Sequence, residues 1–171
     1  MRLADTFYRG HDPKWDWSPL SGEGAAIHGG RFNPKGMPAL YLASDVIGAV
    51  NEMSHGFTAR ILPLTMCSYD VDCEQVADLT DETVRARHGT SLEEMAAGWF
   101  PAASSGNPPG WILAHRLVDD GYVGALVPSF ALNAEPRHRN LVLWDWGPDL
   151  PSRVAVYDPS GRLPKNALSW A

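Results

Sequence analysis

Residues 29–52 read GGRFNPKGMPALYLASDVIGAVNE, and this stretch decides how the rest of the chain is interpreted. Two glycines free the backbone immediately before Arg31. Asn33-Pro34 and Gly36 follow, and these residue types are typical of a turn. The sequence therefore predicts that Arg31 lies at a defined bend of the chain.

A short strand and a helix are predicted directly after this bend. Residues 39–42 have a strand-like composition, and Ser44-Asp45 is typical of a helix N-cap followed by an acidic first turn. Glu52 then falls about two turns into the helix. We expect Arg31, Tyr41 and Glu52 to face one cleft.

The predicted helix has an apolar stripe, made by Val46, Ile47, Val50 and Met53 at helical spacing. Glu52 projects away from this stripe, so it faces either solvent or a cleft. A lone glutamate on a helix is more often a solvated charge. Spacing alone leaves both alternatives open.

The rest of the chain mixes strand-like and helix-like segments. The sequence predicts strands at 3–9, 59–71, 122–128, 140–144 and 153–157, helical segments at 78–97 and 111–120, and loops at 10–24 and 100–109. Their alternation is too irregular for a doubly wound sheet, so we predict an α+β fold with mixed or antiparallel strands and flanking helices. A length of 171 residues suits a single domain over residues 1–171.

Charge and composition restrict the partners and the compartment. The net charge is −6, and the one compact basic run is Arg137-His138-Arg139, so nucleic acid is not an expected partner. No stretch approaches the roughly 20 apolar residues of a membrane span, and the N-terminus lacks the apolar core of a signal peptide. We expect a cytoplasmic protein in which Cys67 and Cys73 are buried free thiols.

Several kinds of chemistry lack their sequence signature. The six histidines form no HxxxH or HExxH pair, so no metal site is expected. Ser129 lacks the flanking glycines of a nucleophile elbow. No phosphate-binding glycine loop occurs, so a bound phosphate would need side chains such as Arg9 and Arg31, whose guanidinium groups suit a diphosphate.

Taken in order, these motifs resemble the RES-domain family over roughly residues 3–157. The family takes its name from an arginine, a glutamate and a serine, which Arg31, Glu52 and Ser129 match. The other matching features are Arg9, the Gly30-Arg31-Phe32-Asn33 turn with Gly36, the strand at 39–42 and Pro128 before the serine. Many members have tryptophan where this chain has Phe32, so the aromatic character is kept.

The resemblance implies a fold similar to the ADP-ribosyltransferase toxins and NAD⁺ as substrate. It further implies the toxin of a bacterial toxin–antitoxin pair, held inactive by an antitoxin protein with a helix-turn-helix, Xre-like domain. Some members degrade NAD⁺ with water or phosphate as acceptor, and others transfer ADP-ribose to a protein.

The resemblance also implies roles for individual residues. Glu52 is expected to hold the ribose 2′-hydroxyl and to stabilise an oxocarbenium-like transition state. Arg31, with Arg9, is expected to bind the diphosphate. The expected catalytic residues are Glu52, Arg31 and Tyr41, and the expected NAD-binding residues are Arg9, Arg31, Tyr41, Ser129 and Asn140. Tyr41 would stack on nicotinamide or ribose, and Ser129 would orient Glu52 or a ribose hydroxyl.

Two other functions remain as alternatives. In a non-catalytic binding module, Arg31 and Glu52 would form a structural ion pair, and Trp15 and Trp17 would belong to a protein interface. An RNA-cleaving toxin fits poorly with the acidic chain and its lack of a histidine pair. Release of free nicotinamide would distinguish the enzyme from both.

Overall fold

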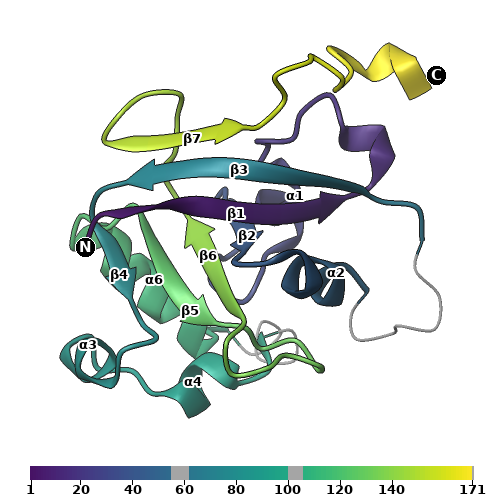
Figure 1. Cartoon of the computed structure of the whole chain (residues 1–171). Helices are drawn as coiled ribbons and strands as arrows, with labels where there is room; N and C mark the ends of the chain where they lie inside the picture. Colours follow the sequence, from purple (N-terminus) through teal and green to yellow (C-terminus); the bar gives the residue numbers. More distant parts are fainter. Residues whose placement is uncertain (55–61, 100–105, 171) are drawn as a thin grey trace.

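A seven-stranded mixed sheet organises the computed structural model, which describes residues 1–54, 62–99 and 106–170 (Figure 1). The strands are β1 (Leu3–His11), β2 (Leu40–Ala43), β3 (Thr65–Cys73), β4 (Val76–Asp78), β5 (Gly124–Pro128), β6 (Arg139–Leu143) and β7 (Ser152–Val156). Their order in the sheet is β4-β5-β6-β2-β1-β3-β7. β4 and β5 pair in parallel and the other neighbours are antiparallel, which confirms the predicted α+β class.

Helices and short 3₁₀ turns flank the sheet. In the described part of the chain they are η1 (Pro13–Trp15), α1 (Glu23–His28), α2 (Val46–Ser54), α3 (Glu82–Arg87), α4 (Leu92–Ala96), α6 (Pro109–Asp119) and η2 (Ala167–Trp170). None of the helices within the described ranges is long and apolar enough to cross a membrane.

Strand alternation builds a core on each face of the sheet. Leu40 and Leu42 belong to one buried cluster, whereas Tyr41 packs against the other, because successive side chains of a strand point to opposite faces. In the second cluster α6 contributes Leu113 and Leu117, each at most 3% exposed. Burial of such a leucine contributes roughly 1.5–3 kcal/mol to the free energy of unfolding.

Two predicted segments have different boundaries in the structure. The strand predicted at 59–71 is β3, which begins at Thr65 and continues to Cys73, and residues 59–61 lie outside the described part of the chain. The helical segment predicted at 78–97 is instead the end of β4 followed by two short helices. Asp81 caps α3 and Ser91 caps α4 through a capping box, so local caps divide the segment.

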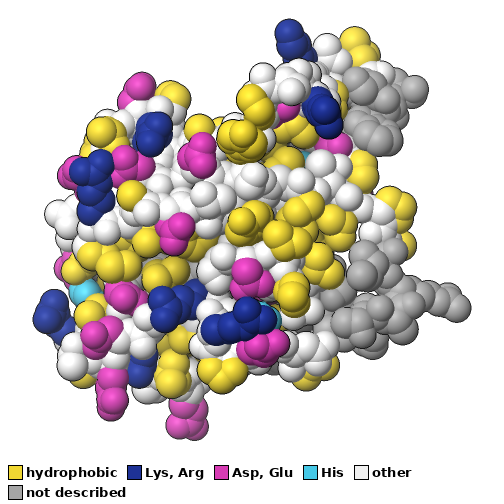
Figure 2. Space-filling view, in the orientation of Figure 1, with side chains coloured by type: hydrophobic (Ala, Val, Ile, Leu, Met, Phe, Trp, Pro, Cys, Tyr) yellow, Lys and Arg dark blue, Asp and Glu magenta, His cyan; other side chains and the backbone are white. Residues whose placement is uncertain are grey.

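Most of the apolar stripe of α2 faces solvent, an exposure about which the sequence made no prediction. Val46, Ile47 and Met53 are 45%, 57% and 40% exposed, whereas Ala49 and Asn51 are buried. The small side chain of Ala49 allows α2 to approach β1 and β2 closely, so the helix packs with its small-residue side. Figure 2 shows hydrophobic side chains gathered on the surface over α2.

The predicted loop at 10–24 contains a 3₁₀ turn and the start of an α-helix, neither of which was predicted. It contains η1 and the first turn of α1, which ends where Gly29 adopts a positive φ of 75°. Cys67 and Cys73 are buried and not disulfide-bonded, as predicted.

Candidate functional site

The carboxylate of Glu52 receives two hydrogen bonds from the neighbouring strands. Ser129 Oγ donates to Glu52 Oε1 at 2.8 Å, and Asn140 Nδ2 donates to the same oxygen at 2.6 Å. Ser129 follows the end of β5 and Asn140 lies in β6, so the two partners come from the ends of adjacent strands. The sequence left open whether Glu52 faces solvent or a cleft. Glu52 is exposed to solvent and also lines a cleft, so both alternatives are partly right.

Four of the expected residues line one small cavity. Arg31, Tyr41 and Glu52 share the wall of a cavity of about 90 Å³, together with Asn140 and Phe130. An adjoining cavity of about 590 Å³ shares Tyr41, Glu52 and Asn140 and extends to Arg9. The predicted site residues therefore line these two adjoining cavities, except Ser129, which contacts the Glu52 carboxylate directly.

A larger hollow of about 700 Å³ lies elsewhere, along α6. Its lining includes Trp111, His115 and Asp119 but none of the predicted site residues. We place the candidate site at Glu52 because a convergent carboxylate, amide and guanidinium are better evidence for chemistry than volume.

Arg31 is held by backbone carbonyls and by an aromatic ring. Its Nη1 donates to the carbonyl oxygens of Met95, Ala96 and Ala97 at 3.1, 2.8 and 2.8 Å. These carbonyls are at the C-terminal end of α4, where a positive charge is favourable. The guanidinium also lies over Phe130, 5.0 Å from the ring centroid.

These contacts orient Arg31 on the cavity wall. Burial lowers the pKa of its guanidinium, and the nearby Glu52 carboxylate opposes that shift. Because Nη1 is already hydrogen-bonded to carbonyls at the end of α4, the N–H groups on Nε and Nη2 are the donors that an anionic ligand could use. The expected diphosphate-binding role remains a prediction.

The bend that carries Arg31 is fixed by side chains on both sides. Tyr41 accepts a 3.1 Å hydrogen bond from the Phe32 backbone N–H and donates a 2.7 Å bond to Asn33 Oδ1. Burial raises the pKa of the Tyr41 phenol, so it remains a neutral donor. A Cβ at Gly30 would approach the Tyr41 hydroxyl within 2.7 Å, which explains the glycine at this position.

Two tryptophans complete the support of the bend, a role that no sequence pattern indicates. Trp111 Nε1 donates to the Gly30 carbonyl at 2.8 Å, and Trp144 Nε1 donates to the Phe32 carbonyl at 2.8 Å. They come from α6 and from the residue after β6, so the Arg31 bend joins elements far apart in the sequence.

Arg9 connects the cleft to the 10–24 loop. Its Nη1 donates to the carbonyl oxygens of Pro19 and Ser21 at 3.1 and 3.2 Å, and burial lowers its pKa. Arg9 also lines the 590 Å³ cavity and a neighbouring cavity of about 300 Å³ beneath Trp15. The arginine therefore supports the loop and reaches the cleft.

His11 and Asp16 form a buried pair beside Arg9, and sequence reasoning missed it. His11 Nε2 lies 3.0 Å from Asp16 Oδ1, and Thr65 Oγ1 donates to Asp16 Oδ2 at 2.7 Å. Burial lowers the pKa of His11, with Arg9 acting in the same direction and Asp16 opposing. His11 lines both larger cavities of the cleft.

Histidine and carboxylate side chains line the cleft, but those in the described part of the chain are not grouped as metal ligands. Across residues 1–54, 62–99 and 106–170, no group of three His, Cys, Asp or Glu side chains could hold a metal ion. The polar groups available to a ligand in the described cleft are thus carboxylate, amide, guanidinium, imidazole and hydroxyl groups.

Comparison with known proteins agrees with the motifs on which the resemblance was based. A family model described as the RES domain matches residues 6–166. No curated protein sequence matches the chain. The matched range includes Arg9, Arg31, Glu52 and Ser129 and covers nearly the whole chain.

Proposed function

We propose that this chain, which belongs to the RES-domain family, cleaves NAD⁺ at the nicotinamide–ribose bond and passes the ADP-ribosyl group to an acceptor. The observation that carries the proposal is the Glu52 carboxylate on the cleft wall, bound through Oε1 by Ser129 and Asn140. In the part of the chain that the structure describes, no side chain donates to Oε2. That oxygen is available to accept a hydrogen bond from a ribose hydroxyl.

The expected chemistry needs such a carboxylate. The bond between C1′ and the nicotinamide nitrogen breaks with its electron pair going to nitrogen, and nicotinamide leaves as a neutral molecule. Positive charge develops on the ribose ring, and a fixed carboxylate holding the 2′-hydroxyl is stabilising at that moment. The acceptor then forms the new bond to C1′ and releases a proton.

The other residues position the substrate in this proposal. Arg31 and Arg9 bind the diphosphate with the guanidinium donors that do not hold backbone carbonyls. Tyr41 presents its ring to the nicotinamide or the ribose, because its hydroxyl is already bonded to the Arg31 bend. Ser129 and Asn140 fix the carboxylate, which matches the orienting role expected for the serine.

The family further supports the proposal that the protein is the toxin of a toxin–antitoxin pair. An enzyme that consumes NAD⁺ harms its own cell unless a binder covers its cleft. We place that partner, a helix-turn-helix antitoxin, over the cleft mouth, where Trp15 is 52% exposed and Ile47 and Met53 of α2 are also exposed. Exposed large apolar side chains beside a cleft are typical of an interface.

Product analysis tests the proposed reaction. The protein is incubated with NAD⁺, alone, with inorganic phosphate, and with a cell lysate, and the products are identified by mass spectrometry. Free ADP-ribose, ADP-ribose phosphate or a protein adduct of roughly 541 Da (NAD⁺ less nicotinamide) identifies water, phosphate or protein as acceptor. Intact NAD⁺ under all three conditions would instead favour the non-catalytic binding module.

A further inference from the structure

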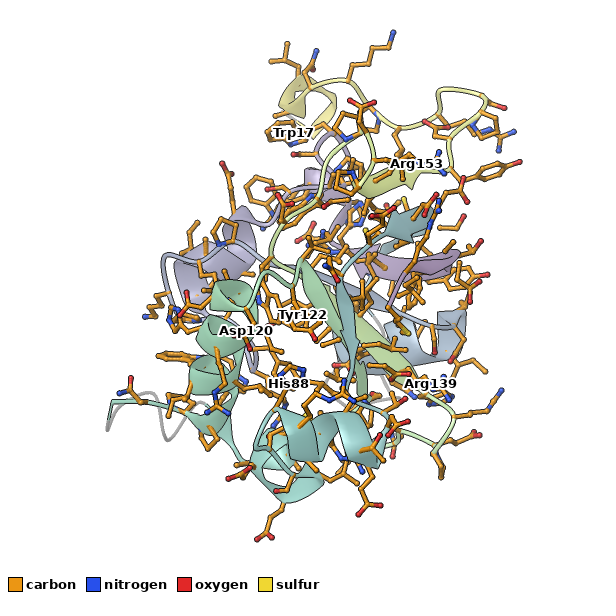
Figure 3. All side chains as sticks on the ribbon, turned by 90° about the vertical axis from the view of Figure 1, so that its left-hand side faces the viewer. Trp17, His88, Asp120, Tyr122, Arg139 and Arg153 are labelled. Atoms are coloured by element: carbon orange, nitrogen blue, oxygen red, sulfur yellow. The ribbon has the colours of Figure 1, made fainter. Side chains whose placement is uncertain are left out.

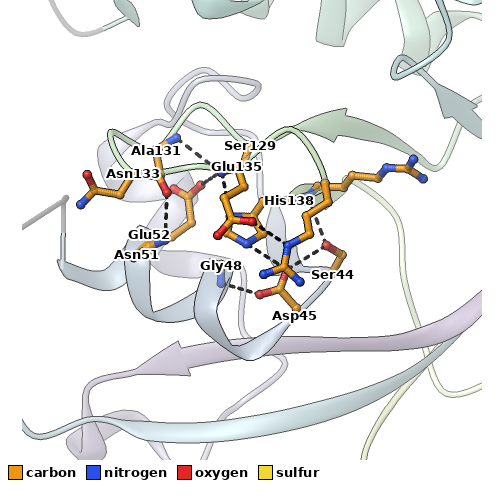
Figure 4. Close-up of polar contacts among 12 residues, drawn as sticks. Ser44, Asp45, Gly48, Asn51, Glu52, Ser129, Ala131, Asn133, Glu135 and His138 are labelled. Carbon is orange, nitrogen blue, oxygen red and sulfur yellow. Dashed lines mark hydrogen bonds and ion pairs between the residues drawn. The ribbon is translucent and has the colours of Figure 1, made fainter. Parts of the chain in front are cut away.

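The connection between β5 and β6 determines where the two donors to Glu52 lie. Ser129 is at the start of this connection, and Asn140 lies just after its end. Glu52 itself is on α2, which belongs to a different part of the chain. The hydrogen bonds at Glu52 therefore depend on how α2 is held against the 129–139 segment (Figure 4).

His138 lies near the end of that segment, immediately before β6, and is only 2% exposed. Its carbonyl accepts a 2.9 Å hydrogen bond from the Ser129 N–H, so its backbone directly fixes the residue that binds Glu52. The imidazole Nδ1 of His138 accepts a 3.1 Å hydrogen bond from the Glu135 backbone N–H. The backbone N–H of His138 donates to the Glu135 carbonyl at 2.9 Å. The backbone of His138 thus binds Ser129 and Glu135, and its buried imidazole adds a side-chain bond to Glu135 that holds the His138 backbone in this position.

The other ring nitrogen of His138 faces the start of α2. Because Nδ1 is an acceptor, the neutral imidazole carries its hydrogen on Nε2. His138 Nε2 lies 3.8 Å from Asp45 Oδ2, beyond hydrogen-bond length but close enough for favourable electrostatic attraction. Asp45 Oδ1 accepts a 2.8 Å bond from the Gly48 N–H and so caps the helix.

A pair of hydrogen bonds beside His138 joins the same two segments. The Ser44 N–H donates to the Arg139 carbonyl at 2.8 Å, and the Arg139 N–H donates to Ser44 Oγ at 3.1 Å. Ser44 and Asp45, which lead into α2, are consequently connected to Arg139 by two hydrogen bonds and to His138 by the electrostatic contact of Asp45, and Glu52 is about two turns further along the chain.

We propose that His138 is a positioning residue for the Glu52 carboxylate. It does not line either cavity that contains Glu52, so it is not a catalytic residue. It fixes Ser129 through the loop and faces the cap of α2 through Nε2, and so sets the distance between Ser129 Oγ and Glu52. This inference rests on the proposed NAD⁺-cleaving function of the same site.

The chain offers a matched control in His88. That histidine is 8% exposed, its Nδ1 lies 3.9 Å from Asp120 Oδ2, and its ring packs edge-on against Tyr122. Figure 3 labels these three residues, and none of them lines the cavities of Glu52. Replacing His88 should therefore disturb a similar buried environment without moving the site.

The test compares His138→Ala, His138→Asn and His88→Ala for NAD⁺ turnover and thermal stability. His138→Ala should lower kcat about 10-fold or more with little change in KM, because the displaced carboxylate acts in the transition state. His138→Asn should recover most of this loss, because its side-chain oxygen can replace Nδ1 as acceptor. His88→Ala should lower the melting temperature and leave kcat unchanged.

A double-mutant cycle with Ser129→Ala tests whether His138 acts through the serine. In the Ser129→Ala background, His138→Ala should lower kcat by less than about 3-fold, since the bond it positions is already absent. Fully additive losses, or a folded His138→Ala protein with wild-type kcat, would overturn the proposal. If His138→Ala does not fold, His138→Leu, which fills the space but removes the Nδ1 acceptor, takes its place in the cycle.

Hydrogen exchange keeps this inference separate from the proposed function. The amides of Ser129 and Glu135 should exchange faster in His138→Ala than in wild type, and unchanged exchange overturns the positioning role whatever the activity. If the wild-type protein leaves NAD⁺ intact, the proposed function fails. Faster exchange would then still support the structural part of the inference.

Discussion

Ser129 Oγ donates a 2.8 Å hydrogen bond to Oε1 of Glu52, although the two residues are 77 positions apart in the sequence. Asn140 shares the same oxygen, so the carboxylate of an exposed residue has a fixed orientation at the mouth of the cleft. A solvated glutamate on a helix surface would have no such constraint.

Arg31→Lys should not rescue Arg31→Ala. Lysine cannot reproduce the contact with three carbonyl oxygens at the end of α4 together with the stacking on Phe130. Both variants should lose NAD⁺ binding in a calorimetric titration, and Arg153→Lys on β7, where the arginine is exposed, should not. Near-wild-type affinity in Arg31→Lys would show that only the charge matters.

Tyr41→Phe should destabilise the protein and lower its NAD⁺ turnover. Removal of the hydroxyl leaves the Phe32 N–H and Asn33 Oδ1 without their partner, at a cost of about 1–3 kcal/mol. For a chain of this length each kcal/mol corresponds to roughly 2–4 °C in melting temperature. Thermal unfolding checks this against Tyr157→Phe, whose tyrosine is 64% exposed, and equal melting temperatures would contradict the role of Tyr41 in the bend.

Acidification should destabilise the fold through His11. Burial lowers the pKa of His11 in the folded state, whereas an unfolded histidine titrates near roughly 6.5. Below about pH 6.5 the unfolded chain therefore binds more protons, and the free energy of unfolding falls as pH falls towards the folded pKa. The contribution of His11 to the free energy of unfolding is therefore fully present above about pH 6.5, where the histidine is neutral in both the folded and the unfolded chain.

Denaturant unfolding between about pH 7.5 and pH 5 measures this effect. His11→Gln should show a smaller loss of stability over that range than wild type, whatever its stability at neutral pH. His115→Gln replaces an exposed histidine on α6 and should keep the wild-type slope. A wild-type slope in His11→Gln would show that another group is responsible.

Trp15→Ala should weaken antitoxin binding without much loss of stability, and Trp17→Ala should do the reverse. Trp15 is 52% exposed, whereas Trp17 is partly buried and its ring lies 6.3 Å from that of Trp15. Affinity for the cognate antitoxin and melting temperature are measured on the same preparations. Unchanged affinity in Trp15→Ala, with a lower melting temperature, would refute an interface at this loop.

Local sequence patterns were sufficient to predict six of the seven strands and the residues that the structure brings together around Glu52. The 39–42 strand and the position of Glu52 each depend on a few neighbouring residues, and both are found in the structure, whereas the helix is capped by Asp45 and not by Ser44. Which face of α2 is exposed could not be predicted, because hydrophobic spacing indicates an apolar stripe but does not say what covers it.

The supporting contacts could not be predicted because they join distant segments. Trp111 and Trp144 hold the Arg31 bend across 81 and 112 positions, and Arg31 itself reaches α4 across 64 to 66. His138 appeared in the sequence only as part of a basic run, although its side chain is buried. Such partners depend on the tertiary arrangement, which no local pattern specifies.

Release of nicotinamide by wild type and by Glu52→Gln tests the central claim most directly. The glutamine is nearly isosteric, and residue 52 is exposed, so the variant should fold with a wild-type melting temperature. Loss of the carboxylate should cost about 2–4 kcal/mol of transition-state stabilisation, or about 30- to 1000-fold in rate. The account predicts nicotinamide release by wild type and a decrease of this size in Glu52→Gln, whereas equal rates in the two proteins, or no release by wild type, would contradict it.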